Sequence, residues 1–324
     1  MVKGSMSTVA RKSLRIVITG ASTGVGLALA RLLLPTKHRL TLTARESSLA
    51  RLREAGFHDS ERLFLCPLDI TKGSERKAAI DATVARYGGI DVLVNNAGIT
   101  YRSVTEHVTM PDLLAQMDVN FRSPMALIRL SLPYMRAQRW GRILNVSSVG
   151  GMMAMPTMGA YSASKWALEG MSEALWYEAR PFNIHVSLIQ PGFINSDGFE
   201  KVRFTGPSAT GKDSHTDPYY EHYRGMSGFI GKVMRAVPAT SDSVARTIVR
   251  TIERERPPLR VPATMDAHLF ALLRRLLPRP LYHWVLYRSL PGIRRWGLGQ
   301  LANVNSPPAL VADGEDQDRP TVAT

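Results

Sequence analysis

The stretch from Leu14 to Leu34, LRIVITGASTGVGLALARLLL, constrains the fold of this chain more than any other. Leu14 to Thr19 is a short apolar run typical of a buried strand, and Leu27 to Leu34 has the pattern of a helix. The glycine turn between them would let the backbone approach a pyrophosphate, and the helix N-terminus would offer N–H groups to it. The sequence therefore predicts a dinucleotide-binding unit. Its predicted contacts are Gly20, Ser22, Thr23, Gly24, Val25 and Gly26.

Strands and helices continue to alternate after this unit. Further strands are predicted at 39–44, 63–68, 91–94, 141–146, 184–189 and 259–261. Helices are predicted at 74–87, 111–138, 161–179 and 241–254, the second of them bent shortly before Pro124. This rhythm is typical of an α/β fold with one doubly wound parallel sheet of about seven strands and helices on both faces. We expect such a Rossmann domain over residues 14–262, after a flexible leader at 1–13.

The end of the second strand indicates which dinucleotide binds. Ala44 and Arg45 stand where an NAD enzyme places an Asp or Glu against the ribose 2′-hydroxyl. No carboxylate is there to repel a 2′-phosphate, and a guanidinium is present to bind it, so NADP(H) is the predicted coenzyme. An ordinary surface charge is the alternative interpretation of Arg45.

Ser148, Tyr161 and Lys165 are the candidate reactive group. Tyr161 and Lys165 are four residues apart in a predicted helix, so their side chains lie one turn apart on one face. An adjacent ammonium favours the phenolate and is expected to lower the pKa of the phenol, which makes Tyr161 a candidate general acid and base. The strand ending at Val146 can bring the Ser148 hydroxyl beside it. Because this spacing alone is common at protein surfaces, the interpretation depends on the neighbouring motifs.

Taken in order, these motifs resemble those of the short-chain dehydrogenase/reductase family over residues 14–262. The matching segments are TGASTGVG, LDIT, NNAG, Asn120, Ser148, YSASK and Pro191-Gly192. The resemblance implies a catalytic set of Asn120, Ser148, Tyr161 and Lys165, in which Asn120 holds a water that links Lys165 to solvent. It further implies coenzyme contacts at Asp69, Ile70, Asn96, Ala97, Gly98, Tyr161, Lys165, Pro191, Gly192 and Ile194.

The same resemblance implies hydride transfer between a nicotinamide and a carbonyl or carbinol carbon. Segments such as YSASKWALEGMSEAL are similar to the 17β-hydroxysteroid and retinol dehydrogenase branch. A lipophilic substrate is therefore expected: a steroid, a retinoid or a long-chain keto-lipid. A 3-ketosphinganine or 3-oxoacyl reductase is an alternative, and a non-catalytic NADP-binding regulator is an alternative from another class. No metal site is predicted.

Three regions stand apart from the predicted sheet. Residues 193–235, with scattered glycines and aromatics, are interpreted as a mobile substrate lid. Residues 263–302 mix arginines with Leu, Trp and Tyr, and they would lie on a membrane surface or pack on the protein's own domain. Residues 303–324 are polar and acidic and are predicted to be disordered. A small-residue stripe in the helix at 161–179 suits contact with another subunit, so a homodimer or homotetramer is expected.

The formal net charge of +14 implies acidic partners. Nucleic acid is not expected among them, because the arginines interleave with aliphatic residues. The single cysteine, Cys66, indicates a reducing compartment, and the sequence shows neither a secretory signal nor a long uncharged apolar run. A cytoplasmic location is therefore predicted, with a peripheral position on a membrane as the alternative.

Overall fold

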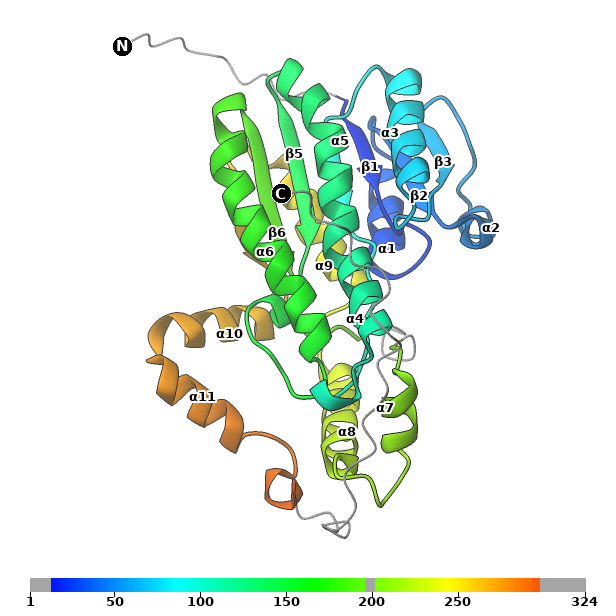
Figure 1. The fold of residues 1–324 in the computed structure, drawn as a ribbon. Helices are drawn as coiled ribbons and strands as arrows, with labels where there is room; N and C mark the ends of the chain where they lie inside the picture. The colour runs from blue at the N-terminus through cyan, green and yellow to red at the C-terminus, as the bar shows by residue number, and fades with distance from the viewer. Residues whose placement is uncertain (1–12, 196–201, 298–324) are drawn as a thin grey trace, which may run out of the picture.

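The computed structural model describes residues 13–195 and 202–297 (Figure 1). Most of the predicted leader, the predicted tail at 303–324 and part of the predicted lid fall outside these ranges. Within them, one sheet is covered by helices on both faces, and a smaller helical part lies beyond one end of the sheet.

Seven parallel strands form the sheet in the order β3-β2-β1-β4-β5-β6-β7, which confirms the predicted fold class. β1 lies between β2 and β4, so the order of the strands reverses there, and such sheets bind ligands at the carboxyl ends of the strands beside this point. The strands are β1 (Arg15–Ile18), β2 (Arg39–Ala44), β3 (Leu63–Pro67), β4 (Val92–Asn95), β5 (Gly141–Val146), β6 (Ile184–Gln190) and β7 (Arg260–Pro262).

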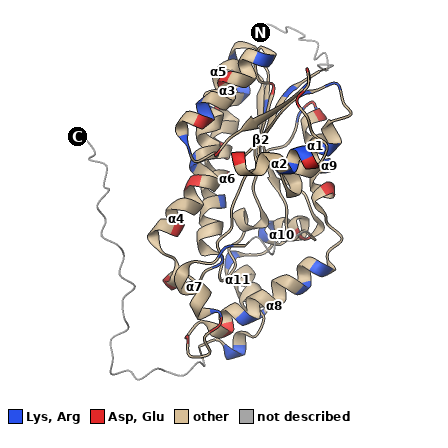
Figure 2. Ribbon diagram, turned by 90° about the vertical axis from the view of Figure 1, so that its right-hand side faces the viewer, with Lys and Arg blue, Asp and Glu red and all other residues tan. Residues whose placement is uncertain are grey.

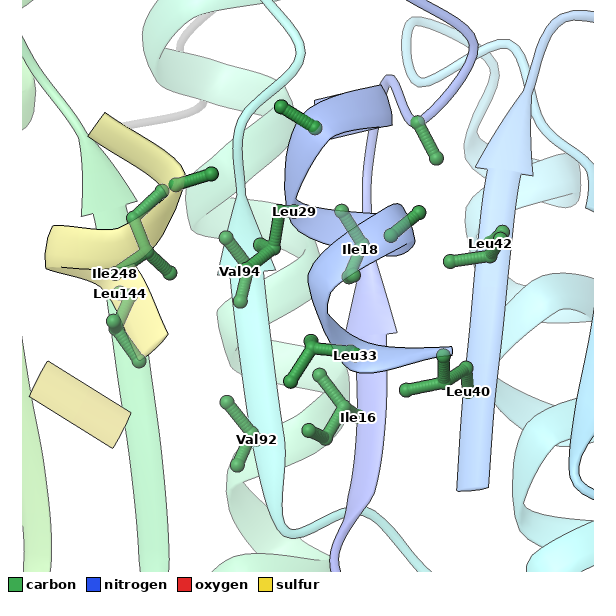
Figure 3. Packing of buried hydrophobic residues seen from close by; sticks show 14 of the residues in the cluster. Ile16, Ile18, Leu29, Leu33, Leu40, Leu42, Val92, Val94, Leu144 and Ile248 are labelled. Carbon is green, nitrogen blue, oxygen red and sulfur yellow. The ribbon is translucent and has the colours of Figure 1, made fainter. Parts of the chain in front are cut away.

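Alternate residues of each strand enter the cores on opposite faces of the sheet. Ile16 and Ile18 of β1 pack in one core with Leu29 of the first helix (Figure 3), whereas Val17 packs in the other core. The first core lies under α1 (Gly24–Leu33), α2 (Glu46–Glu54) and α9 (Ser241–Glu253). The second lies under α3 (Gly73–Tyr87), α5 (Ser123–Ala137) and α6 (Gly159–Ala179). Because the inner strands are buried on both faces, they are mostly apolar and easy to recognise in the sequence.

Two helical regions differ from the prediction. The sequence does not predict α2, because its segment ESSLARLRE is mostly polar and buries little beyond Leu49 and Leu52. The predicted helix at 111–138 is divided into α4 (Met110–Met117), a π-helical turn over Asp118–Arg122, and α5. The predicted bend before Pro124 is therefore present, and it takes the form of this π-helical turn.

The part of the chain beyond the sheet is more regular than predicted. The described portion of the predicted lid contains α7 (Gly206–Gly211) and α8 (Tyr220–Ala236). The buried positions of α8 include Tyr223, Met226 and Ile230, and this apolar face is interrupted in the sequence by glycines, which hide its helical period. The C-terminal region forms α10 (Met265–Leu276) and α11 (Arg279–Arg288). Short 3-10 helices lie at Thr105–His107, Val149–Gly151, Arg180–Phe182 and Ile293–Arg295.

Lys and Arg are interspersed with Asp and Glu on many of the outer helices (Figure 2). Across the described ranges, no helix combines the length and the apolar character needed to cross a bilayer. The same ranges hold no group of three or more His, Cys, Asp or Glu side chains placed to bind a metal ion.

Candidate active site

The glycine turn between β1 and α1 is closed tightly against β4. A Cβ atom at Gly26 would lie 2.3 Å from the Gly20 carbonyl oxygen, and one at Gly20 would lie 2.9 Å from the Cα of Ala97. Gly20 also has φ +66°, a left-handed conformation that favours glycine. Only glycine therefore fits at positions 20 and 26. The resulting tight turn is the backbone shape that lets a pyrophosphate approach closely.

Asn96 fastens this turn. Its Nδ2 donates to the carbonyl oxygens of Thr19 and Gly20 at 2.9 and 3.1 Å, and the Thr19 hydroxyl accepts from the backbone N–H groups of Asn96 and Ala97. Ser22, Thr23, Gly24 and Val25 complete the turn and the start of α1. Thr23, the N-cap residue of α1, makes no side-chain cap hydrogen bond. The helix N-terminus therefore presents N–H groups that match an anionic phosphate.

The end of β2 carries the residues predicted to select the coenzyme. Ala44 is buried, and Arg45 is exposed as the residue that precedes α2. Asp69, which follows β3, has its pKa lowered, mainly by a hydrogen bond from the Thr71 hydroxyl and to a smaller extent by nearby Arg45. Arg45 is therefore near enough to Asp69 to act on its carboxylate, and Ile70, the next residue, is buried.

Ser148 and Tyr161 meet at the carboxyl end of β5. Ser148 has extended backbone and begins the short helix at Val149–Gly151, while Tyr161 lies in the first turn of α6. A Cβ atom at Gly150 would lie 2.9 Å from the Tyr161 ring, so this glycine lets the two segments approach. A hydrogen bond from Ser148 lowers the pKa of Tyr161, but desolvation by burial is larger and raises it. The net shift of the Tyr161 pKa is therefore upward, opposite to the net lowering expected from the sequence, because burial dominates.

Lys165 is buried one helical turn after Tyr161. Its ammonium donates to the Val146 carbonyl oxygen at 2.8 Å and lies 5.8 Å from the centre of the Tyr161 ring. Burial lowers the pKa of Lys165 to about 8, and the charge of Glu169 acts in the opposite direction. A lysine with a pKa near neutrality can exchange protons at working pH.

Asn120 lies in the π-helical turn and holds the neighbouring backbone. Its Oδ1 accepts from the Ile99 N–H at 2.9 Å, and its Nδ2 donates to the Ile99 carbonyl oxygen at 2.9 Å and to the Ser164 hydroxyl at 3.1 Å. A Cβ atom at Gly98 would lie 3.3 Å from Asn120 Oδ1 and 3.9 Å from Lys165 Nζ, so Asn120 and Lys165 approach one another on either side of Gly98.

The segment after β6 is held by the start of α10. The Gly192 N–H donates to Thr264 Oγ1 and the Phe193 N–H donates to Asp266 Oδ2, each at 2.8 Å. A Cβ atom at Gly192 would collide with Asp266, so the close approach requires glycine. This contact brings Pro191, Gly192 and Ile194 to the same edge of the sheet as the glycine turn and Tyr161.

A cavity of about 200 Å³ opens beside Ser148 and Tyr161. Its lining is mostly apolar, with polar groups from Thr100, Arg102 and Ser162. The apolar lining comes from Val149, Met155, Met158, Phe193, Ile194, Val202, Ile230 and Met234. The cavity therefore joins the candidate reactive residues to an apolar surface provided by the predicted lid and by the residues after β5.

Residues 15–205 match the family model described as short chain dehydrogenase. The chain belongs to the short-chain dehydrogenase family. It is 32% identical over 272 residues to a 3-ketodihydrosphingosine reductase from Bacteroides thetaiotaomicron, with 84% of this chain and 96% of the relative covered.

Solved short-chain dehydrogenases have the same fold. A short-chain dehydrogenase from Streptomyces avermitilis is 30% identical, with a TM-score of 0.70 over 86% of this chain and 96% of that one. A Burkholderia phymatum member of the family in complex with NAD is 25% identical, with a TM-score of 0.68 over 84% and 95% of the two chains. As a short-chain dehydrogenase/reductase, the chain is an oxidoreductase that acts on CH–OH groups with a nicotinamide coenzyme.

Several residues at this site escaped the sequence prediction. Glu169 lies one turn after Lys165 and is buried, and Arg102 lines the cavity as a buried guanidinium. Glu169 is four residues after Lys165 and eight after Tyr161, and this helical spacing is its only signal in the sequence. Arg102 lies in a loop, where periodicity gives none.

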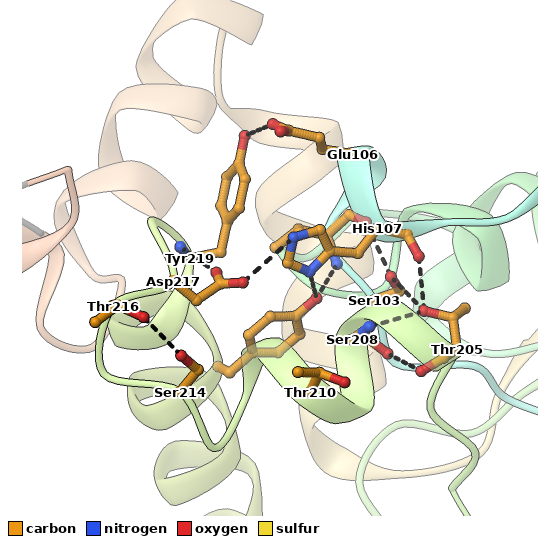
Figure 4. A network of polar contacts seen from close by, with 12 residues as sticks. Ser103, Glu106, His107, Thr205, Ser208, Thr210, Ser214, Thr216, Asp217 and Tyr219 are labelled. Atoms are coloured by element: carbon orange, nitrogen blue, oxygen red, sulfur yellow. Dashed lines mark hydrogen bonds and ion pairs between the residues drawn. The ribbon is translucent and has the colours of Figure 1, made fainter. Parts of the chain in front are cut away.

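A polar network also fastens the predicted lid (Figure 4). His107 Nδ1 lies 3.0 Å from the Tyr223 hydroxyl, and its Nε2 lies 3.6 Å from Asp217. The Tyr219 hydroxyl donates to Glu106, and the Thr205 hydroxyl donates to the His107 carbonyl oxygen. This network holds α7 and α8 against residues 103–107.

Proposed function

We propose that the protein interconverts a carbonyl and an alcohol on a lipophilic substrate with NADP(H). The observation that carries this proposal is the apolar cavity, because Ser148 and Tyr161 lie in its wall. A substrate whose reacting carbon bears an apolar body can bury that body among the methionines of the cavity and direct its oxygen to the two hydroxyl groups.

Each catalytic residue then has a separate role. Bound coenzyme would supply or accept the hydride. Ser148 holds the substrate oxygen, and Tyr161 gives a proton to that oxygen during reduction and removes it during oxidation. The Lys165 charge favours the Tyr161 phenolate. Asn120 fixes the Ile99 backbone and binds a water beside Lys165. Burial makes the Tyr161 phenol a weak acid, so the charge of Lys165 is needed at this step.

NADP(H) is the proposed coenzyme because of the residues at the end of β2. The Arg45 guanidinium can bind a 2′-phosphate, and Ala44 presents no carboxylate to repel it. Titrating the wild type and Arg45→Ala with NADPH and NADH tests this proposal. We expect the substitution to weaken NADPH binding alone, and equal affinities that the substitution leaves unchanged would contradict it.

Arg102 narrows the choice of substrate. Its buried side chain reaches Ser227 of α8 at 3.2 Å and adds donors to one wall of an otherwise apolar cavity. A long-chain keto-lipid with a hydrogen-bond acceptor beside its carbonyl, such as a 3-oxoacyl compound, fits this wall better than retinal does. Arg102→Gln should raise the KM for the oxoacyl substrate more than for retinal, with Arg203→Gln as the exposed control.

The decisive experiment follows NADPH oxidation with steroid, retinoid, 3-ketosphinganine and 3-oxoacyl carbonyls. Tyr161→Phe should abolish turnover and leave coenzyme binding nearly intact, because it removes the transferable proton and little else. A variant with near-normal rates would refute the role of Tyr161. A wild-type protein that binds NADPH and reduces none of these classes would instead favour a non-catalytic NADP-binding regulator.

The C-terminal helices offer a surface that suits a membrane interface. Phe270 packs with Val149 and Met152, and Tyr282 is buried. The Arg274 guanidinium donates to the Met152 carbonyl and lies over Trp166. The exposed apolar stripe of α10 consists of residues at helical spacing: Met265, Leu269, Leu272 and Leu276.

We propose that this stripe and exposed Leu281, Trp284 and Tyr287 contact an anionic membrane, with exposed Arg275 and Arg279 beside them. Flotation with anionic and neutral liposomes tests it, using the full chain and Leu269→Glu/Leu272→Glu. We expect flotation of the full chain with anionic lipid at low salt, lost in the double variant. A chain that stays unbound would contradict a membrane role.

We also propose that the protein is a homodimer or homotetramer. On α6, Ala163, Gly170 and Ala174 of the small-residue stripe are exposed, and so are Trp166 and Tyr177. This apolar face suits close packing of α6 against a second subunit. Light scattering of the wild type and Ala163→Glu tests it, and a monomeric wild type would contradict it.

A further inference from the structure

Glu169 is a buried carboxylate to which the proposed reaction assigns no role. It lies on α6 and is only 6% exposed. Its Oε1 accepts a hydrogen bond from the Ser147 hydroxyl at 2.7 Å and another from Gln190 Nε2 at 2.8 Å. Burying a carboxylate destabilises the fold unless the carboxylate is hydrogen-bonded or paired with a cation, so both oxygens of Glu169 need partners.

The partners of Glu169 come from the two strands that carry the site. Ser147 directly precedes Ser148 at the end of β5, and Gln190 is the last residue of β6, directly before Pro191 and Gly192. One carboxylate oxygen therefore ties the segment bearing the substrate-binding serine to the segment expected to contact the coenzyme. A Cβ atom at Gly151 would lie 2.5 Å from the same oxygen, so the turn after Ser148 also packs against it.

The charge of Glu169 acts on the catalytic lysine. Lys165 is one turn earlier on α6, and the carboxylate opposes the lowering of its pKa by burial. On β7, Arg260 Nε lies 3.6 Å from Glu169 Oε2. Tyr161 on α6 lies beside Lys165, and Glu173 on α6 pairs with the same Arg260. The polar partners Ser147 and Gln190 of Glu169, and Asn120 near Lys165, are neutral.

We propose that Glu169 is a positioning residue of the active site, which holds the ends of β5 and β6 in register beside Ser148 and keeps Lys165 charged in its buried position. The inference rests on the proposed function, because it assigns Lys165 and Ser148 their roles there. Glu169 would then be the third functional residue on one face of α6, one helical turn after Lys165 and two turns after Tyr161.

Glu169→Gln tests the charge, because the amide oxygen still accepts the hydrogen bonds from Ser147 and Gln190. The matched control is Glu173→Gln: Glu173 is one turn further along α6, is 42% exposed and pairs with the same Arg260 at 2.8 Å. The measurement is the pH dependence of kcat/KM for carbonyl reduction. Removing the Glu169 charge lowers the pKa of Lys165, so activity should fall at a lower pH than in the wild type and in Glu173→Gln.

Glu169→Ala tests the hydrogen bonds. It should lower kcat/KM on the order of ten- to a hundredfold below Glu169→Gln at pH 7, because Ser148 loses its fixed position. The inference is overturned if Glu169→Gln has the pH profile of the wild type and if Glu169→Ala, folded by circular dichroism, has the same kcat/KM as Glu169→Gln.

A second measurement separates this inference from the proposed function. A wild type that reduces no carbonyl would refute the proposed function, yet its NADPH affinity can still be followed by fluorescence from pH 6 to 10. With Lys165 bound to the coenzyme ribose, affinity should fall at a lower pH in Glu169→Gln than in Glu173→Gln. Identical pH dependence in the two variants would refute the role of Glu169 by itself.

Discussion

Replacing Lys165 with Met should make the protein more stable while it destroys activity. Burial lowers the pKa of Lys165 from 10.5 to about 8 in the folded protein. At 1.36 kcal/mol for each pKa unit, keeping this ammonium charged at pH 7 costs the fold roughly 3 kcal/mol. Methionine has a similar length and no charge, so it removes this cost.

The gain is reduced by the hydrogen bond that the substitution deletes. Lys165 donates to the Val146 carbonyl, and leaving that buried acceptor unpaired costs about 1 kcal/mol. Lys165→Met should therefore raise the free energy of unfolding by about 2 kcal/mol at pH 7, equivalent to about 3–5 °C in Tm for a chain of this size.

The pH dependence identifies the cause. The pKa of Lys165 is lower in the folded protein than in the unfolded chain, so the unfolded chain binds the proton more tightly. The cost of the buried charge to folding stability is therefore complete below about pH 8 and decreases as the pH rises toward 10.5. Urea unfolding at pH 7 and pH 9.5 should show the advantage of Lys165→Met shrinking to roughly zero. A variant less stable than the wild type at pH 7, or an advantage independent of pH, would refute the reasoning.

Three further substitutions test other parts of the site. Gly26→Ala should weaken coenzyme binding at least about tenfold without unfolding the protein, measured by fluorescence titration and circular dichroism, because its Cβ would displace the Gly20 carbonyl. Asn120→Ala leaves the half-buried N–H of Ile99 without its acceptor, whereas the Ile99 carbonyl keeps its hydrogen bond from Gln116, so the substitution should lower the free energy of unfolding by about 1–3 kcal/mol in urea. Asp266→Ala frees the Phe193 N–H and should raise the coenzyme KM more than it lowers kcat; an unchanged KM would contradict this.

The strands and the order of the site motifs were predictable because both depend on local sequence. The inner strands of a doubly wound sheet are buried on both faces, which gives apolar runs such as Ile16 to Ile18. Gly20 and Gly26 are determined by a close approach within one turn. The polar helix α2 and the glycine-interrupted helix α8 were missed because tertiary packing, more than their own periodicity, stabilises them.

The environment of each catalytic side chain depended on the tertiary structure. Spacing placed Tyr161 and Lys165 on one face of a helix, but the sign of the Tyr161 pKa shift follows from burial, to which residues distant in sequence contribute. In the sequence, Arg274 is one of several arginines in the mixed segment at 263–302, and only the fold brings it to Met152 and Trp166.

Short motifs and apolar periodicity were enough to predict the family, the sheet and the four candidate catalytic residues. Packing of the folded chain was needed to show that Glu169 lies between the ends of β5 and β6, that Arg102 enters the cavity, and that α10 turns Phe270 inward and its leucine stripe outward. Such contacts join residues far apart in the chain, and the free energies of burial and charge pairing that select them arise only when the chain is packed.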